Sequence, residues 1–348
     1  MKHTHLHTRL LALLLCCALV LPLSACGEAK STTQQIFAMD TVMDLTAYGK
    51  KADDGINAAI SIINSMDTLL DPENERSKTY EINHAMGSPV VVNEQIAKML
   101  RTALTVYERT NGAFDLTTYP LSKLWGFIDQ NYRVPSDAEI ERLLPCVDMS
   151  KVQLAATDDS ANSLVTMPAD MALSFGAVAK GCASEYAIQA MRAAGVTSGV
   201  VSLGGNVQTL GKKPDGSDWN IAIQDPNDTG SYLGYLTVGE TAVITSGSYQ
   251  RYFTEGGQKY HHILSPTTGR PVNNGLLAVT IVCEDGTLAD CLSTAMFVLG
   301  PQAALNYWRT YGGFEMILVN KDNQITCTKG LMEQFTLAND SYTLRYTE

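Results

Sequence analysis

The chain has 348 residues, of which 45% are hydrophobic and 18% are charged, and its formal net charge is −11 at pH 7. This composition is typical of a globular protein with a full core. The acidic balance excludes the basic footprint of a nucleic-acid-binding protein, and it means that an anionic ligand needs local help from a cation or a helix N-terminus.

The N-terminal stretch has the features of an export signal. Lys2 and Arg9 make its first part basic, and an apolar run, LLALLLCCALVLPL, follows that is too short to span a bilayer comfortably. Two small residues then precede Cys26, as in a bacterial lipobox. We predict a signal peptide at 1–25, lipid attachment at Cys26 and a polar tether at 26–35. A plain secretory signal with a chance cysteine is the alternative.

A lipid-modified Cys26 determines where the protein works. Several acyl chains on one residue give stable membrane anchoring. We therefore expect the protein at the extracytoplasmic face of a bacterial membrane, held there by its lipid anchor. The cysteines beyond this position are few and scattered, lack a CxxC pair, and are typical of buried small hydrophobic residues with at most one incidental disulfide. They are Cys146, Cys182, Cys283, Cys291 and Cys327.

The first half of the chain begins with a partly alternating, β-like stretch that ends at Gly49. Apolar residues at helical spacing then predict a helix over 56–70. A second helix is predicted to begin at Asn93, a suitable N-cap, and to stop at 111–112, where an Asn-Gly pair stands. A short helix with acidic residues in its first turn is predicted over 135–144.

The second half mixes strands and helices with hairpin-like spacing, which favours an α+β fold over a doubly wound sheet. We predict mixed, largely antiparallel sheets packed with helices. Because no linker rich in Pro or Ser divides the chain, residues 36–345 are expected to form one compact domain or two interleaved lobes. The predicted strands are 199–203, 219–225, 277–283 and 314–319, and the predicted helices are 182–195, 288–300 and 301–313.

The stretch FGAVAKGCASEYAIQAM opens a helix directly after a turn flanked by glycines. The free N–H groups of that helix start, together with Lys180, have the chemistry to hold a phosphate or a pyrophosphate. It is not a P-loop, because no Lys-Ser or Lys-Thr follows the second glycine. The alternative is a tight turn that needs Gly176 and Gly181 only for backbone shape.

Asp290 and Thr294 stand four residues apart and therefore share one face of a predicted helix. A carboxylate with a hydroxyl one turn later can ligate Mg²⁺, which prefers hard oxygen donors. The alternative is structural: Thr287 caps the helix, Asp290 favours its positive end, and Thr294 hydrogen-bonds back to a carbonyl.

Two further stretches contain candidate site residues. Phe114 and Trp125 follow the second helix and have the shape to line a pocket for a flat ring, although such residues are more often core. His261 and His262 lead into a Pro-Thr-Thr-Gly turn. Because adjacent strand residues point to opposite faces, at most one of this pair faces a given site, and histidine is a natural general base near pH 7.

Taken in order, these stretches resemble the family of FAD:protein FMN transferases, also called ApbE-type flavin transferases. The resemblance spans nearly the whole mature chain, and the lipobox is similar to that of exported members. The matching stretches are AMDTVMDLTAYG, NGAFDLTTYPLSKLWGF, FGAVAKGCASEYAIQAM, VSLGGNVQTLG, ITSGSYQRYF, YHHILSPTTGRPV and LADCLSTAMFVLG.

The resemblance implies a Mg²⁺-dependent transfer of FMN from FAD to a Thr or Ser hydroxyl of an acceptor protein, with release of AMP. The expected acceptor is a flavoprotein subunit of an extracytoplasmic or membrane redox complex. The resemblance also implies flavin contacts at Met39, Ala113, Phe114, Asp115, Ser174, Lys180 and Ile263. It implies metal ligands at Ala177, through its main-chain oxygen, and at Asp290 and Thr294, and it points to His262 as the catalytic base.

Three serines stand where this family usually has aspartate: Ser174, Ser248 and Ser265. Each replacement removes a carboxylate that we expect near the site, so the group that deprotonates the acceptor hydroxyl is His262 or a metal-bound water. Two alternative functions keep the same site. One is a Mg²⁺-dependent FAD pyrophosphatase that gives FMN and AMP, and the other is a flavin-binding lipoprotein without turnover.

Overall fold

The computed structural model describes residues 30–159 and 161–347, and the chain from Ser31 onward clusters as one compact unit. The predicted signal peptide (1–25) and Cys26 lie outside the described residues. Within the described ranges, no helix combines the length and the apolar character needed to cross a membrane.

The polar segment after Cys26 is a strand where a tether was predicted. Strand β1 (Ser31–Ala38) pairs antiparallel with β2 (Thr41–Tyr48) along its whole length. Because β1 is the edge strand of its sheet and most of its side chains are exposed or half-buried, a polar sequence is compatible with it. The predicted tether, 26–35, is therefore wrong from Ser31 onward.

The described strands form one nine-stranded sheet and three smaller sheets. The large sheet has the order β1–β2–β6–β7–β10–β13–β14–β15–β17, and its neighbours are antiparallel except for the parallel pair β15–β17. This arrangement confirms the predicted α+β class. The further strands are β6 (Gly199–Leu203), β7 (Asn206–Leu210), β10 (Ala242–Gly247), β13 (Leu276–Cys283), β14 (Glu315–Asn320), β15 (Gln324–Cys327) and β17 (Thr343–Tyr346).

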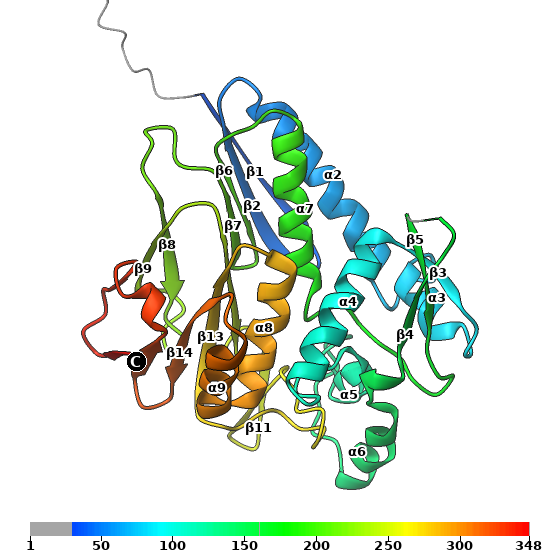
Figure 1. Cartoon of the computed structure of the whole chain (residues 1–348). Helices are drawn as coiled ribbons and strands as arrows, with labels where there is room; N and C mark the ends of the chain where they lie inside the picture. Colours follow the sequence, from blue (N-terminus) through cyan, green and yellow to red (C-terminus); the bar gives the residue numbers. More distant parts are fainter. Residues whose placement is uncertain (1–29, 160, 348) are drawn as a thin grey trace, which may run out of the picture. The chain divides into compact units, whose positions relative to one another are not determined.

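Helices cover one face of the large sheet (Figure 1). They are α2 (Ala52–Leu70), α7 (Ala179–Ala193) and α8 (Gly286–Leu299), with α4 (Glu94–Arg109) and α9 (Pro301–Tyr311) packed against α8. Alternate strand residues such as Leu45, Val201 and Ile281 point into this layer and are fully buried. Burial of the helices' apolar faces against the sheet therefore forms the main core.

A three-stranded sheet of order β16–β9–β8 packs on the opposite face of the large sheet. Its strands are β8 (Trp219–Gln224), β9 (Tyr232–Val238) and β16 (Phe335–Leu337). Strand β8 alternates strictly between buried and exposed residues, and its buried residues Trp219, Ile221 and Ile223 belong to the same apolar cluster as Val243 of the large sheet. A second core thus lies between the two sheets.

A third, smaller apolar cluster supports the hairpin of β11 (Tyr252–Glu255) and β12 (Gln258–His261). It contains Leu264 together with Trp125 and other residues of the helical segment 116–146. That segment comprises η1 (Leu116–Thr118), α5 (Tyr119–Leu124), α6 (Asp137–Leu143) and η2 (Leu144–Cys146). The remaining elements are α3 (Lys78–His84), β3 (Val90–Asn93), η3 (Met149–Lys151), β4 (Gln153–Ala156), β5 (Asn162–Thr166) and η4 (Lys329–Leu331).

The helix boundaries test the predicted caps. Asn93 is the N-cap of α4, where its Oδ1 accepts a hydrogen bond from the N–H of Ile96 at 3.2 Å, as predicted. Helix α8 is capped by Asp285 rather than by Thr287. The hydroxyl of Thr287 instead donates to Glu185 at 2.8 Å, and so it ties α8 to α7.

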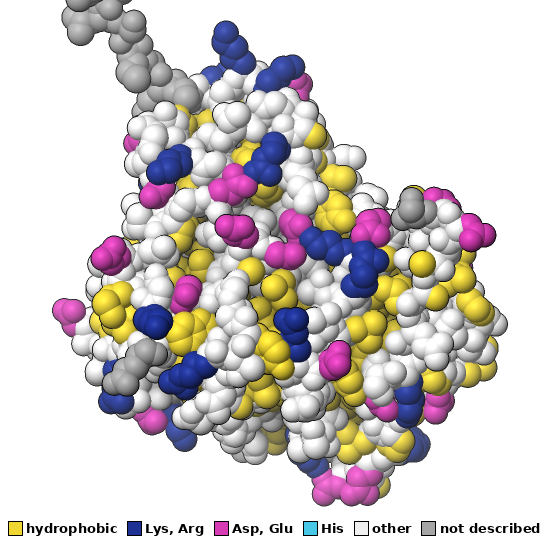
Figure 2. Space-filling view, viewed as in Figure 1, with side chains coloured by type: hydrophobic (Ala, Val, Ile, Leu, Met, Phe, Trp, Pro, Cys, Tyr) yellow, Lys and Arg dark blue, Asp and Glu magenta, His cyan; other side chains and the backbone are white. Residues whose placement is uncertain are grey.

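Charged side chains of both signs are interspersed on the face of the protein that Figure 2 shows. Several of them pair, such as Arg101 with Glu94. The five cysteines of the described part are all free, and four of them are buried, in agreement with their predicted role as small hydrophobic residues.

Candidate active site

A cavity of about 1120 Å³ opens where the helix layer, the β8–β9 sheet and the hairpin meet. This volume is slightly above the usual range of about 300–1,000 Å³ for small-molecule pockets, so it has room for a large ligand. Within the described chain, every site residue that the family resemblance implied lines this cavity. These residues are Met39, Ala113, Phe114, Asp115, Ser174, Ala177, Lys180, His262, Ile263, Asp290 and Thr294. Trp125, a candidate from the sequence, is instead fully buried in the small apolar cluster.

The cavity floor depends on a close approach of α7 to α8. Gly181 lies so near α8 that a Cβ at this position would stand 2.1 Å from the carbonyl oxygen of Gly286 and 2.5 Å from the Cβ of Asp290. Only glycine fits this contact. The contact lets the N–H of Gly181 donate to Oδ2 of Asp290 at 2.8 Å. The turn before α7 and the acid of α8 are thereby brought together.

Asp290 is almost completely buried, with 3% of its surface exposed. Burial raises the pKa of its carboxyl group, while Lys180, the N–H of Gly181 and the amide of Asn206 oppose that rise. The Asn206 amide donates to Oδ1 at 3.2 Å. Since each carboxylate oxygen has two lone pairs, each keeps one that can bind a cation.

The residues around Asp290 have the donor chemistry of a Mg²⁺ site. The hydroxyl of Thr294 lies 3.2 Å from that of Ser246 and keeps a lone pair, and Ala177 contributes a half-buried turn at the cavity. Oδ1 of Asn206, beside Asp290, is a buried acceptor without a hydrogen-bond partner among the described residues. A buried oxygen without a hydrogen-bond partner, next to a buried carboxylate, is consistent with a site where a hard cation would bind.

This donor set has a single acid. Among the described residues, no group of three or more His, Cys, Asp or Glu side chains is placed to hold a metal ion. Mg²⁺ is usually bound by one or two carboxylates, waters and substrate phosphates rather than by a cage of side chains. The chemistry of Asp290 and Thr294 therefore fits an ion that is bound jointly with a phosphate ligand.

The adjacent histidines diverge, as strand alternation requires. His261 is buried, stacks edge-on against Phe297, and its Nε2 lies 2.8 Å from the carbonyl oxygen of Val272. Its Nδ1 accepts from the N–H of Ile263 at 3.3 Å, so both ring nitrogens are used in packing. His262 lines the cavity instead.

The hydrogen bonds of His262 determine which ring nitrogen carries the proton. Its Nδ1 lies 3.1 Å from the carbonyl oxygen of Arg251, which can only accept, so Nδ1 bears the hydrogen and Nε2 keeps its lone pair. Enclosure by the cavity wall, followed by the charges of Arg251 and Lys180, lowers the pKa of His262 to about 3. The ring is therefore neutral near pH 7 and has an acceptor nitrogen.

The opposite end of the cavity is shaped by a tight turn between β1 and β2. Met39 and Asp40 both have positive φ, 48° and 58°, although neither is glycine. The N–H of Met39 donates to Asp67 at 2.9 Å, which holds the turn against α2. Strained backbone at a cavity wall is common where side-chain placement matters.

Asp115 lines the cavity, but its carboxylate mainly stabilises its own loop through hydrogen bonds. Its Oδ1 accepts from the N–H and the hydroxyl of Thr117 at 2.7 and 2.6 Å, and its Oδ2 accepts from the N–H of Met149 at 3.0 Å. Burial raises the pKa of Asp115, against these hydrogen bonds. The carboxylate thus fixes the loop that carries the buried Phe114.

Of the three serines expected near the site, only Ser174 lines the cavity. Its hydroxyl accepts from the N–H of Gly176 at 3.2 Å within the turn before α7. Ser248 is tied to the carbonyl of Leu277, and Ser265 accepts from the N–H of Thr268 at 3.3 Å inside the Pro-Thr-Thr-Gly turn. Ser248 and Ser265 therefore do not line the cavity themselves, although their neighbours Tyr249 and Pro266 do, so both positions are near the site, as expected.

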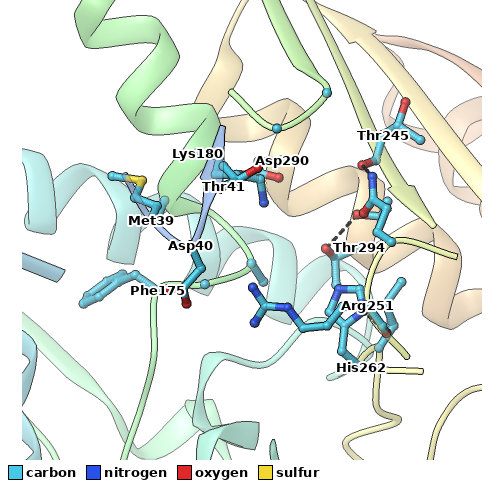
Figure 3. A pocket seen from close by; sticks show the side chains of 18 of the residues that line it. Met39, Asp40, Thr41, Phe175, Lys180, Thr245, Arg251, His262, Asp290 and Thr294 are labelled. Carbon is cyan, nitrogen blue, oxygen red and sulfur yellow. Dashed lines mark hydrogen bonds between the residues drawn. The ribbon is translucent and has the colours of Figure 1, made fainter. Parts of the chain in front are cut away.

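Sequence reasoning missed several residues of the cavity wall. Arg251 extends into the cavity toward the side that carries Asp40, and Thr245 and Phe175 also lie at its wall (Figure 3). Four consecutive residues of β8, 221–224, complete the wall. The position of Arg251 within the stretch ITSGSYQRYF, next to a hydroxyl-rich turn, was the available signal for it.

The sequence matches the ApbE family over residues 39–318. It is similar to an FAD:protein FMN transferase of Klebsiella pneumoniae (strain 342), with 30% identity over 81% of this chain and 87% of that protein. It is also similar to an FAD:protein FMN transferase of Treponema pallidum (strain Nichols), with 27% identity over 92% of this chain and 94% of that protein.

The fold is similar to that of solved ApbE structures. The ApbE protein from Thermotoga maritima superposes with a TM-score of 0.81 at 30% identity, covering 88% of this chain and 99% of the other. The flavin transferase ApbE from Vibrio cholerae superposes with a TM-score of 0.79 at 22% identity, with the same coverage of the two chains, which supports the fold alone.

Proposed function

This chain belongs to the ApbE family, and from that membership we propose that it is an enzyme that transfers FMN from FAD to a hydroxyl group of a partner protein. The observation that carries the proposal is the joint position of Asp290, Thr294, Lys180 and His262 on one cavity. A cation site, an anion site and a neutral acceptor nitrogen are the parts that phosphoryl transfer to a hydroxyl requires.

Each part of the cavity has an assigned role in the reaction. Lys180 holds the diphosphate of FAD, assisted by the positive end of the α7 dipole. The N–H groups of Ala179 and Gly181 already donate within the protein, so the charge of Lys180 is the main contribution. Asp290, Thr294 and the main-chain oxygen of Ala177 hold Mg²⁺. When bound, Mg²⁺ neutralises phosphate charge and stabilises the leaving group.

The covalent step exchanges the phosphoanhydride bond of FAD for a phosphoester bond to the acceptor. The hydroxyl oxygen of an acceptor Thr or Ser bonds to the phosphorus of the FMN half, and the bond from that phosphorus to the bridging oxygen breaks. AMP leaves with the electron pair of that bond. Nε2 of His262 accepts the hydroxyl proton, since its lone pair is free and Nδ1 is held by the Arg251 carbonyl.

The flavin ring is assigned to the end of the cavity formed by Met39, Phe114 and the turn that Asp115 braces. Apolar side chains with a few fixed polar groups are suited to a flat aromatic ring. Ala113, Ser174 and Ile263 complete this wall in the proposal. Their side chains are small or apolar and leave room for a ligand.

The proposed setting is the extracytoplasmic face of a bacterial membrane. Lipid attachment at Cys26 after removal of residues 1–25 is the basis of this part of the proposal. The partner would be a flavoprotein subunit of a redox complex that exposes a Thr or Ser at the same face.

The experiment combines FAD, Mg²⁺ and a protein with an exposed acceptor threonine, followed by mass spectrometry of that protein. The proposal predicts an FMN-sized mass gain on the acceptor and release of AMP. Free FMN and AMP without a modified acceptor would instead favour the FAD pyrophosphatase. Bound flavin without turnover would leave a flavin-binding lipoprotein and overturn the proposal.

A further inference from the structure

Arg251 stands beside His262 because the hairpin places it there. Strands β11 and β12 pair Tyr252 with His261, so Arg251 and His262 form the next pair at the open end of the hairpin. The carbonyl oxygen of Arg251 accepts from the peptide N–H of His262 at 3.1 Å and from its ring Nδ1 at 3.1 Å. The backbone of one residue therefore fixes both the position and the tautomer of the other.

The guanidinium of Arg251 is directed into the cavity (Figure 3). Of its donors, one reaches the carbonyl oxygen of Phe127, at a long 3.5 Å. In the described part of the chain it has no salt bridge to a carboxylate, whereas Arg133 and Arg270 near the same hairpin pair with Glu139 and Asp137. A guanidinium has five N–H donors in a planar fork, so most of the donors of Arg251 remain available to a ligand.

The position suits an anion. Arg251 and Lys180 both line the cavity, in a chain whose net charge is −11. Guanidinium groups bind phosphate oxygens in pairs and with charge-assisted hydrogen bonds. The same two cations and His261 are the charged or titratable groups that disfavour a proton on His262, after burial itself. An anion between Arg251 and Lys180 would relieve that effect.

We infer that Arg251 is a further substrate-binding residue of this enzyme: its guanidinium holds the diphosphate of FAD while its carbonyl holds His262, so that arrival of the anion makes His262 a better proton acceptor. The inference rests on the proposed function. It makes the base weak in the empty cavity and stronger only when FAD is present. Because His262 is a weak base in the empty cavity, it also activates water less readily when no substrate is bound.

The first test measures KM for FAD and kcat in Arg251→Gln and Arg251→Lys. Loss of a charge-assisted contact should raise KM for FAD about 10- to 100-fold in Arg251→Gln. Arg251→Lys keeps the positive charge but loses the planar pair of N–H donors. Its KM for FAD should lie between the KM of Arg251→Gln and that of the unchanged protein. An unchanged KM in a folded Arg251→Gln variant overturns the inference.

The second test distinguishes binding from a merely structural role. NMR titration of His262 with inorganic pyrophosphate and Mg²⁺ should show a rise in the His262 pKa in the unchanged protein. In Arg251→Gln, the pKa in the empty cavity should already be higher and the rise on pyrophosphate addition smaller. The same rise in both proteins would contradict the inference.

Lys259→Gln is the matched control. Lys259 lies on the same hairpin, where its Nζ stands 3.7 Å from the ring centre of Tyr252, and it does not line the cavity. Its removal should leave KM and the His262 titration unchanged. If the unchanged protein fails to modify any acceptor, the proposed function fails. If it is active and Arg251→Gln matches it, only the inference fails.

Discussion

The two walls of the cavity are built in different ways. We call the group of Gly181, Asp290 and Thr294 the helix wall, and the pair of Arg251 and His262 the hairpin wall. The helix wall lies in the main core, where glycine packing joins α7 to α8. The hairpin wall is the end of a two-stranded sheet that rests on a small aromatic cluster.

The comparison of the two walls shows how rigidity is distributed around the site. A metal ligand must be held close to a fixed position, and the helix wall does so with buried helices in direct backbone contact. Two-stranded hairpins are marginal alone and depend on what supports them. The hairpin wall therefore offers less rigid placement, and His262 depends on the Arg251 carbonyl for its orientation.

Replacement of Asp290 should give the largest effect, because it removes the only acid among the proposed metal ligands. Asp290→Ala is expected to reduce FMN transfer by about 1,000-fold or more. Asp285→Asn on the same helix keeps an N-cap and should retain activity. Transfer rates measured by mass spectrometry check both variants, and comparable rates in the two would contradict the role of Asp290 as a metal ligand in the helix wall.

The adjacent histidines give the next largest effect. His262→Gln should lower kcat by about 100- to 1,000-fold with little change in the midpoint of unfolding, because it removes the proton acceptor. His261→Gln should do the reverse and lower the stability while turnover remains, because His261 packs against Phe297. Equal losses of turnover in the two variants would contradict their assigned roles.

The stability of the protein should also depend on pH through His262. Its pKa is lowered from 6.5 to about 3 in the folded protein, so between these values the unfolded chain binds the extra proton. The free energy of unfolding should therefore fall as the pH drops through this range. In His262→Gln the fall should be smaller, as measured by denaturant unfolding at several pH values.

Gly181→Ala tests the helix wall by overpacking. The added Cβ would meet Gly286 at 2.1 Å, so the helices must separate, and the free energy of unfolding should drop by about 1–3 kcal/mol. For the Gly176→Ala control, the nearest atom is the Ser174 hydroxyl at 3.6 Å. Denaturant unfolding should show little change for that control.

Trp125→Phe tests the support of the hairpin wall. The indole N–H donates to the carbonyl oxygen of Gly269 at 2.8 Å, and the ring lies 5.5 Å from that of Tyr260. Phenylalanine keeps most of the packing but leaves the carbonyl unpaired, so we expect a loss of about 1 kcal/mol in thermal unfolding. A loss well above about 1 kcal/mol would contradict the limited contribution assigned to this hydrogen bond.

Ser265→Asp should have the smallest effect. An aspartate can accept the Thr268 N–H in the same turn, so stability should change by less than about 0.5 kcal/mol and transfer should be unaffected. A marked gain in turnover would show that a carboxylate at this position reaches the site after all.

Much of the fold could be predicted because its signals are local. The cap at Asn93, the apolar spacing of α2 and the alternation of β8 each depend on a few neighbouring residues. The prediction of a tether was wrong from Ser31 onward because a polar edge strand and a polar linker have similar composition. The pairing of that strand with β2 depends on tertiary contacts that composition does not encode.

The site was predictable in part for a related reason. Residues within one motif, such as Asp290 and Thr294, could be found from their spacing and from family resemblance. The contact of Gly181 with Asp290 joins residues 109 positions apart, and its closeness follows from helix packing. Arg251 was missed because its role depends on the hairpin register that sets it beside His262.

The most direct test of the account is a crystal structure with FAD and Mn²⁺, in which anomalous scattering locates the ion. The account predicts an ion within about 2.5 Å of oxygens of Asp290 and Thr294, with the FAD diphosphate as a further ligand. An ion bound elsewhere, while FAD occupies the cavity, would contradict the proposed site and the mechanism that depends on it.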